Sequence, residues 1–390
     1  MSSVYDDLQQ TLAADGPDAA IERLIKRLRE TQEFGHLFYA LLMKKRHEMG
    51  VTPIPTRPAQ ELPETVHADY EEAIRQAGRT VGNLYIDAGD IPAAWHYFRL
   101  IGDPQPVRDA LERYVPTENE DIYPLVEIAF HHRVHPGRGF DLVLDRQGIC
   151  SSITILGSFD SGLEPGVRAY CVRRLVAALH EQLTERLRAE IERHDHKPPE
   201  ATTIPDLITG RRWLFGDDAY LIDLSHLGSV VQMSLHLPPD DPGIPKAREL
   251  CAYGAKLSKK MQSPGEPPFE ELYRDAGIYL KVLAGVDVDA GLGHFRAKVK
   301  TMDLDRGTLP AEVYVNLLLH VGRTADAIKV ARTYLTDADE RQLSSPGPLE
   351  LCRRTGDFAA FADVARVRGD AVHFLAGLLA KGQATRGNPA

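Results

Sequence analysis

Three histidines lie within five residues, directly ahead of Pro136. If residues 121–135 form a single α-helix, Glu127, His131 and His135 follow one another at intervals of four and share one face. A carboxylate and two imidazoles on one helical face are suitable ligands for Zn²⁺ or iron. The spacing therefore predicts a divalent-metal site, which would suit the activation of water or of oxygen.

A further ligand for this metal could come from elsewhere in the chain. His180 lies on a long predicted helix, and Asp223 and His226 are three residues apart, so they could share a helical face. The histidine cluster also has a structural explanation, because histidines in a last helical turn interact favourably with the helix dipole and with unpaired carbonyl groups. Pro136 would end the helix at that point. The residues alone leave both interpretations open.

Two other positions carry residue types that are used in catalysis. Asp223 could orient His226 as a general base, but an aspartate directly before a helix is also a common N-cap. Cys150 follows a glycine and could act as a nucleophile, but a buried structural thiol is the more frequent role of such a cysteine. The phosphate-loop, zincin and nucleophile-elbow motifs are absent from the sequence. The sequence therefore specifies no reaction.

The composition is that of a globular protein and limits the classes of partner. Of the 390 residues, 43% are hydrophobic and 26% are charged, which is enough to bury a core. The formal net charge of −10 argues against nucleic acid, since phosphate binding needs clustered Lys and Arg. The sequence has neither an apolar run long enough for a bilayer nor an N-terminal secretory signal, so no membrane partner is expected. The four widely spaced cysteines favour a reducing, cytoplasmic location.

The hydrophobic pattern predicts a mainly α-helical protein. Residues 18–29 place their apolar side chains on one stripe, as an amphipathic helix does. Residues 164–196 repeat an apolar residue every four positions, from Val167 to Ile191, and predict one long helix. Further helices are predicted over 225–237 and from near Pro245, Pro268 and Asp287.

Residues 64–114 have the spacing of a known repeat. Small and aromatic residues stand at the relative positions of the tetratricopeptide consensus: Gly82, Tyr85, Gly89, Ala94, Phe98 and Pro106. The segment resembles a tetratricopeptide-like helical hairpin, but Gly78 stands where the consensus has tryptophan. With the related segments described next, the resemblance covers about a third of the chain. It implies antiparallel helices whose surfaces bind peptides or proteins.

A second copy of part of this segment occurs near the C-terminus. Residues 89–103 align without gaps with residues 356–370, and both stretches begin and end with Gly-Asp. Each stretch is predicted to enclose a short helix, with glycine in the left-handed conformation and aspartate capping the following helix. A third, partial copy starts at Gly322. These copies predict helical hairpins at both ends of the chain.

The segment between these ends is less regular. Residues 148–157 form a short apolar run between glycines, which fits either a strand or a buried helix. Residues 212–222 suggest a small β-hairpin. We therefore expect three parts: helical hairpins over 1–115, an irregular segment over 116–240 with room for a small β element, and further hairpins over 241–390.

These features support two functions of different classes. The first is an intracellular helical-repeat scaffold that binds a protein or peptide partner. The second is a metal-dependent enzyme of the hydrolase or oxygenase type, with Glu127, His131 and His135 as ligands. An open groove with solvated polar side chains would favour the scaffold. Convergence of the named side chains in a closed pocket would favour the enzyme. No cofactor other than this metal is indicated.

Overall fold

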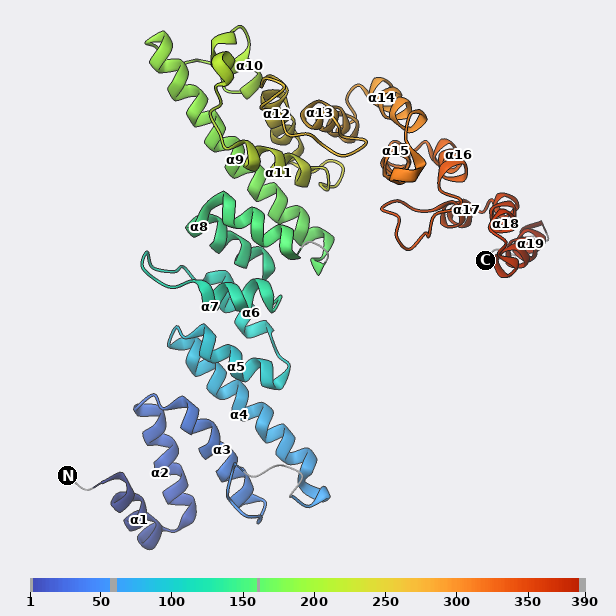
Figure 1. Cartoon of the computed structure of the whole chain (residues 1–390). Helices are drawn as coiled ribbons and strands as arrows, with labels where there is room; N and C mark the ends of the chain where they lie inside the picture. The colour runs from blue at the N-terminus through green and yellow to red at the C-terminus, as the bar shows by residue number, and fades with distance from the viewer. Residues whose placement is uncertain (1–2, 57–61, 160–161, 386–390) are drawn as a thin grey trace. The chain divides into compact units, whose positions relative to one another are not determined.

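The structure, a computed structural model, describes residues 3–56, 62–159 and 162–385. The regular structure in these ranges is α-helical with short 3₁₀ and π segments, and none of it is β-strand (Figure 1). The prediction of an all-α protein is therefore confirmed. In the same ranges, no helix combines the length and the apolar character needed to cross a bilayer.

Contacts between residues divide the chain into two compact units, Met1–Gln147 and Gly148–Ala390. The boundary lies within helix α8 (Pro136–Phe159), where Gly148 has a non-helical backbone with φ of 79°. Glycine adopts this left-handed conformation without the steric cost that a Cβ atom brings. The boundary thus falls inside the stretch 116–240, which the sequence sets apart as irregular.

The first unit consists of helices that mostly follow one another after short turns. Its helices before α8 are α1 (Val4–Asp15), α2 (Pro17–Glu30), α3 (Phe34–Glu48), α4 (His67–Asp87), α5 (Ile91–Ile101), α6 (Gln105–Arg113) and α7 (Tyr123–Val126). Ser3 and Asp6 form a capping box at the start of α1, and Pro17 occupies the first turn of α2. Apolar side chains of α2, α3 and α4 share one buried core.

Helices α4 and α5 pack directly against each other. A Cβ atom at Gly82 would lie 2.5 Å from the Phe98 ring, so the close approach depends on glycine. Ala94 and Phe98 are fully buried at this contact. Gly82, Ala94 and Phe98, three of the residues on which the tetratricopeptide resemblance rests, therefore lie at one helix–helix interface.

The second unit begins with the C-terminal part of α8 and contains a long series of helices. These are α9 (Pro165–Asp195), α10 (Ile204–Ile208), α11 (Leu224–Ser234), α12 (Ile244–Gly254), α13 (Leu272–Leu283), α14 (Val288–Lys300), α15 (Leu309–His320), α16 (Thr324–Tyr334), α17 (Pro348–Thr355), α18 (Phe358–Val367) and α19 (Ala371–Thr385). From α12 to α19 each helix contacts the next one along the chain, and α13 also contacts α15 (Figure 1).

The long helix predicted over residues 164–196 is confirmed as α9. The predicted stripe is its buried face, since the following side chains are fully buried: Cys171, Leu175, Leu179, Leu183, Leu187 and Ile191. Pro165 lies in the first turn, where its missing N–H group costs no helical hydrogen bond. The four-residue spacing alone was sufficient to locate both the helix and the side that it buries.

The two Gly-Asp stretches also have the predicted local structure. Gly89 and Gly356 have φ of 81° and 69°, and the closing glycines of both stretches have φ of 70°. Asp90 and Asp357 each accept a hydrogen bond of 3.0 Å from the backbone N–H three residues further on. The prediction of left-handed glycines and aspartate N-caps around α5 and α18 is therefore confirmed.

The small β element expected within 116–240 is not formed by the described residues. The supposed hairpin over 212–222 contains instead a 3₁₀ helix, Arg212–Asp218, in which Asp217 has φ of 50°. Residues 148–157 belong to α8, so the run between glycines is helical. A short apolar run does not distinguish a strand from a buried helix. The turn residues within 212–222 indicate that the chain changes direction there, but they do not indicate the secondary structure on either side of the turn.

Candidate functional site

The prediction that residues 121–135 form a single α-helix is wrong, so the helical stripe on which the metal-site hypothesis is based does not form. α7 ends at Val126, a π-helix occupies Glu127–His131, and Arg133 is left-handed with φ of 58°. The reason is Pro136, which disfavours helical angles at the residue before it and starts α8 rather than following a helix end. Glu127, His131 and His135 therefore do not follow one another along one α-helical face.

His135 has a structural role that engages both ring nitrogens. Its Nδ1 accepts a hydrogen bond of 3.3 Å from the backbone N–H of Arg138, in the first turn of α8. Because Nδ1 accepts, Nε2 carries the proton in the neutral ring, and it donates to the Glu112 carboxylate on α6. His135 thus caps α8 and ties it to α6, so neither nitrogen is available to a metal without losing one of these bonds.

Glu127 of the predicted site is weakly paired with His132, which is not one of the predicted ligands, and His131 is the last residue of the π-helix. The Nε2 of His132 lies 4.0 Å from a Glu127 oxygen, and 38% and 42% of these side chains are exposed. An ion pair so exposed contributes little. The His132 ring also lies beside Trp95, with centroids 5.7 Å apart. Across the described ranges, no group of three or more His, Cys, Asp or Glu side chains is arranged to hold a metal ion.

His180, Asp223 and His226 lie in the second unit, and each has local partners. The Nε2 of His180 lies 2.9 Å from Glu249, whose carboxylate also accepts a hydrogen bond of 2.8 Å from the N–H of Ile204. Asp223 caps α11 by accepting from the backbone N–H groups of Ser225 and His226. The hydrogen bond from the Ser225 hydroxyl, together with the backbone bonds, lowers the pKa of Asp223 below its usual value. Of the two interpretations of Asp223, the structure shows the N-cap.

The cysteines divide into one exposed and three buried residues. Cys150 is exposed on α8, whereas Cys171, Cys251 and Cys352 are buried. Burial raises the pKa of Cys251 to about 12 and that of Cys352 to about 11, so both remain thiols at neutral pH. A reactive cysteine needs a lowered pKa, which neither of these two has.

The structure also contains a charged cluster that the sequence did not predict. Asp275 on α13 is fully buried and receives three hydrogen bonds, from the N–H of Glu271 at 2.9 Å, from His294 at 2.8 Å and from Lys298 at 2.8 Å. Lys298 also contacts the Glu270 carboxylate. Since His294 and Lys298 lie on α14, the cluster joins two consecutive helices through a buried charge.

The electrostatics of this cluster indicate a structural role. Burial alone would lower the pKa of Lys298, but its bonds to Asp275 and Glu270 outweigh that effect and raise the pKa above 10.5. The ammonium group therefore stays protonated and is no nucleophile. Burial likewise opposes ionisation of Glu270, yet its bond to Lys298 holds its pKa below 4.5. The Lys298 pairing therefore stabilises the fold at neutral pH, and it is lost as pH rises through the raised pKa of Lys298 or falls through the lowered pKa of Glu270.

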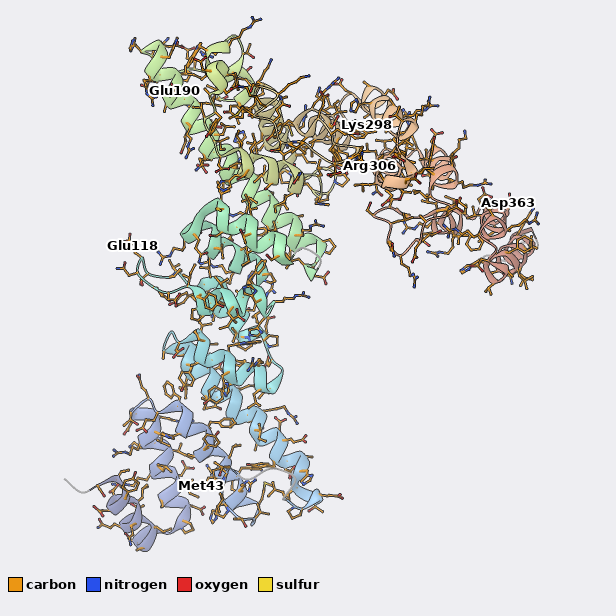
Figure 2. All side chains as sticks on the ribbon, viewed as in Figure 1. Met43, Glu118, Glu190, Lys298, Arg306 and Asp363 are labelled. Atoms are coloured by element: carbon orange, nitrogen blue, oxygen red, sulfur yellow. The ribbon has the colours of Figure 1, made fainter. Side chains whose placement is uncertain are left out.

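Two cavities in the second unit are lined by charges of both signs. One, of about 410 Å³, adjoins the buried cluster and is lined by Lys298 and Arg306, which Figure 2 labels, and by the carboxylates of Glu266, Glu270 and Asp303. The other, of about 940 Å³, is lined by residues of the stretch 336–373. Its arginines already form ion pairs within the chain, among them Arg368 with Glu340 at 2.8 Å. Mixed and paired charges give neither cavity a preference for an ion of one sign.

A third concavity is different, and we call it the α12–α13 groove. It measures about 500 Å³ and is lined by Pro205, Pro245, Arg248, Glu249, Cys251, Ala252, Ala255, Tyr273, Arg274, Gly277, Ile278 and Lys281. Apart from Pro205 of α10, these residues belong to α12 and α13 or directly follow α12, and they recur at intervals of three or four along each helix. Its floor is made of small or apolar side chains, and cationic side chains stand beside them. This combination of an apolar floor and a few polar groups is typical of binding sites.

Comparisons with known proteins give no assignment. No protein-family model matches the chain, and neither a curated protein nor a solved structure matches it.

Proposed function

We propose that this chain is a helical-repeat protein that binds a protein or peptide partner through the α12–α13 groove. The sequential contacts from α12 to α19 support an array, and arrays of this kind use their concave surfaces for binding. The tetratricopeptide-like spacing in residues 64–114 supports the same class by analogy. We extend the proposal to an intracellular location on the basis of the cysteine spacing alone.

The observation that carries the proposal is the groove itself. It is an open trough of about 500 Å³ whose floor includes Ala252, Ala255 and Gly277. Small side chains at these positions leave room for the side chains of a partner between the two helices. By contrast, three residues of the predicted enzyme site, His135, His180 and Asp223, are engaged in helix caps or in interhelical bonds.

Selection from a display library of random short peptides tests the proposal. The full chain is immobilised, and a fluorescein-labelled copy of the most enriched peptide is titrated with protein while anisotropy is measured. We expect saturable binding that Ala252→Leu weakens at least tenfold, because the larger side chain fills the trough. Ala290→Leu, at an exposed position of α14, is the matched control and should leave binding unchanged. The proposal fails if no peptide is enriched, or if no enriched peptide binds saturably.

A further inference from the structure

Each of the two helices lines the α12–α13 groove with a stripe of residues. On α12 the lining residues Pro245, Arg248, Ala252 and, just past the helix, Ala255 recur at intervals of three or four. On α13 the stripe is formed by Arg274, Gly277, Ile278 and Lys281. Residues at this spacing stand above one another on a helix surface, so each stripe runs along its helix. An elongated ligand such as a peptide segment could therefore contact several of them at once.

The floor of the groove leaves room for a ligand because several of its residues are small. A Cβ atom at Gly277 would make only an ordinary contact, 3.5 Å from the Cβ of Cys251. Ala252 and Ile278 are half-buried and remain partly accessible to a ligand. Such a floor can cover one apolar side chain of a partner, with a gain of about 25 cal/mol for each Å² removed from water.

The charges along the groove are mostly positive, although the whole chain carries a net charge of −10. Arg248, Arg274 and Lys281 line it, and Glu249 is the acidic lining residue. The carboxylate of Glu249 is directed towards His180 and the N–H of Ile204, and within the described part of the chain it forms no ion pair with these cations. Three cationic side chains against one carboxylate leave the lining residues with an excess of positive charge.

These cations are available to a ligand. Among the described residues, no carboxylate pairs with Arg248, which is half-buried on α12. Arg274 pairs with Glu271 at 2.6 Å and Lys281 with Asp287 at 3.2 Å, but between 44% and 64% of each of these four side chains is exposed. Exposed pairs are worth about 0–1 kcal/mol, so carboxylates of a ligand can replace them at small cost. Arginine in particular can hold a carboxylate through two parallel hydrogen bonds.

We infer that the α12–α13 groove binds an acidic peptide segment, in which aspartate or glutamate residues flank an apolar side chain that rests on the floor. This inference rests on the proposed function and specifies the chemistry of the partner. Arg248, Arg274 and Lys281 pair with the carboxylates, and Ala252, Gly277 and Ile278 contact the apolar side chain.

The peptides selected from the random library test this inference by their composition and by their response to groove variants. We expect enrichment of Asp and Glu beside Leu, Ile or Phe. For the fluorescein-labelled peptide, Arg248→Gln should weaken binding by about tenfold or more, since a charge-assisted hydrogen bond is worth about 1.5–3 kcal/mol. A copy of the peptide with glutamine and asparagine in place of its glutamate and aspartate residues should bind more weakly by a similar factor. Arg296→Gln, an exposed arginine of α14, is the matched control.

The outcomes separate the inference from the proposed function. If selected peptides lack acidic residues, or bind Arg248→Gln as tightly as the unaltered chain, the inference is wrong and peptide binding stands. If no peptide is selected, both fail. Vesicles of phosphatidylserine and phosphatidylcholine form a further arm. Binding of these vesicles that Arg248→Gln abolishes, without any peptide binding, would assign the groove to anionic headgroups and overturn the inference. Circular dichroism of each variant shows whether the chain is folded.

Discussion

His135 is of a residue type that often binds metal, but both of its ring nitrogens form hydrogen bonds within the chain. Its position before Pro136 removes it from the preceding helix, and its ring then caps the helix that follows. The imidazole accepts at one nitrogen and donates at the other, which fixes its tautomer. The chemistry that the residue type suggested is thus replaced by two hydrogen bonds within the chain.

This assignment predicts the metal content of the protein. Elemental analysis of the purified chain should show no stoichiometric zinc or iron, and the melting temperature should be the same with and without chelator. His131→Ala should leave both results unchanged. His135→Ala should lower the free energy of unfolding by about 1 kcal/mol, since it removes a helix cap. Bound metal in equimolar amount that His131→Ala abolishes would restore the enzyme hypothesis.

The buried cluster around Asp275 predicts a large effect of a small substitution. Asp275→Asn removes the buried negative charge and leaves Lys298 short of a partner, so it should cost about 3–5 kcal/mol of unfolding free energy. Asp289→Asn is a suitable control, because Asp289 is 84% exposed in its pair with Arg323, and such a pair is worth about 0–1 kcal/mol. Urea denaturation of both variants measures the difference. Equal effects would show that burial of the cluster does not matter.

The cysteines predict a simple pattern of chemical reactivity. In the folded chain at pH 8, one thiol should react rapidly with a disulfide reagent such as Ellman's reagent, and Cys150→Ser should remove that fast phase. The buried Cys251 and Cys352 should react only on unfolding, because burial raises the pKa of both thiols and excludes the reagent. A fast phase that persists in Cys150→Ser would contradict the assignment.

At the scale of elements, much of the helical structure could be predicted from the sequence because it is determined locally. The α9 stripe and the Gly-Asp turns around α5 and α18 depend on residues within one or two turns of each other. The prediction of a helix that ends at Pro136 is wrong because proline is common both just after the end of a helix and in the first turn of the next one. Local patterns could not choose between these two positions.

The sites that depend on contacts between elements were not predictable in this way. The spacing of His294 and Lys298 on one helix face was visible in the sequence, but their shared partner Asp275 lies on the preceding helix, 19 residues before His294. The α12–α13 groove likewise requires two stripes to face each other. Neither arrangement leaves a local signal, since a pair of helices can be turned about their axes in many ways.

Two helical glycines predict opposite responses to the same substitution. At Gly82 a methyl group would lie 2.5 Å from the ring of Phe98, so Gly82→Ala should destabilise the chain by about 1–3 kcal/mol through overpacking. At Gly293, on an exposed part of α14, nothing lies within 4 Å of the added methyl group. Gly293→Ala should therefore stabilise by up to about 1 kcal/mol, through helix propensity alone. Thermal or urea denaturation distinguishes the two. Destabilisation at both sites would mean that packing against Phe98 is not the cause.

At the scale of the whole molecule, the division into two units predicts more than one step of unfolding. Long helical arrays lose two-state behaviour because each element is stabilised mainly by its neighbours. Differential scanning calorimetry should resolve two transitions. Phe98 in the first unit and Leu280 in the second are both fully buried. Phe98→Ala and Leu280→Ala should therefore each lower the midpoint temperature of a different transition. A single transition that both variants shift equally would show that the units unfold together.

The exposure of Cys150 has a practical consequence. It lies in the second unit, the unit that also contains the α12–α13 groove, whereas the other three cysteines are buried. A fluorophore or a spin label can therefore be attached at this native position without removing any other thiol. Energy transfer from such a label to a dye on a peptide would report directly whether the ligand reaches this unit, and it would do so on the chain with its natural sequence.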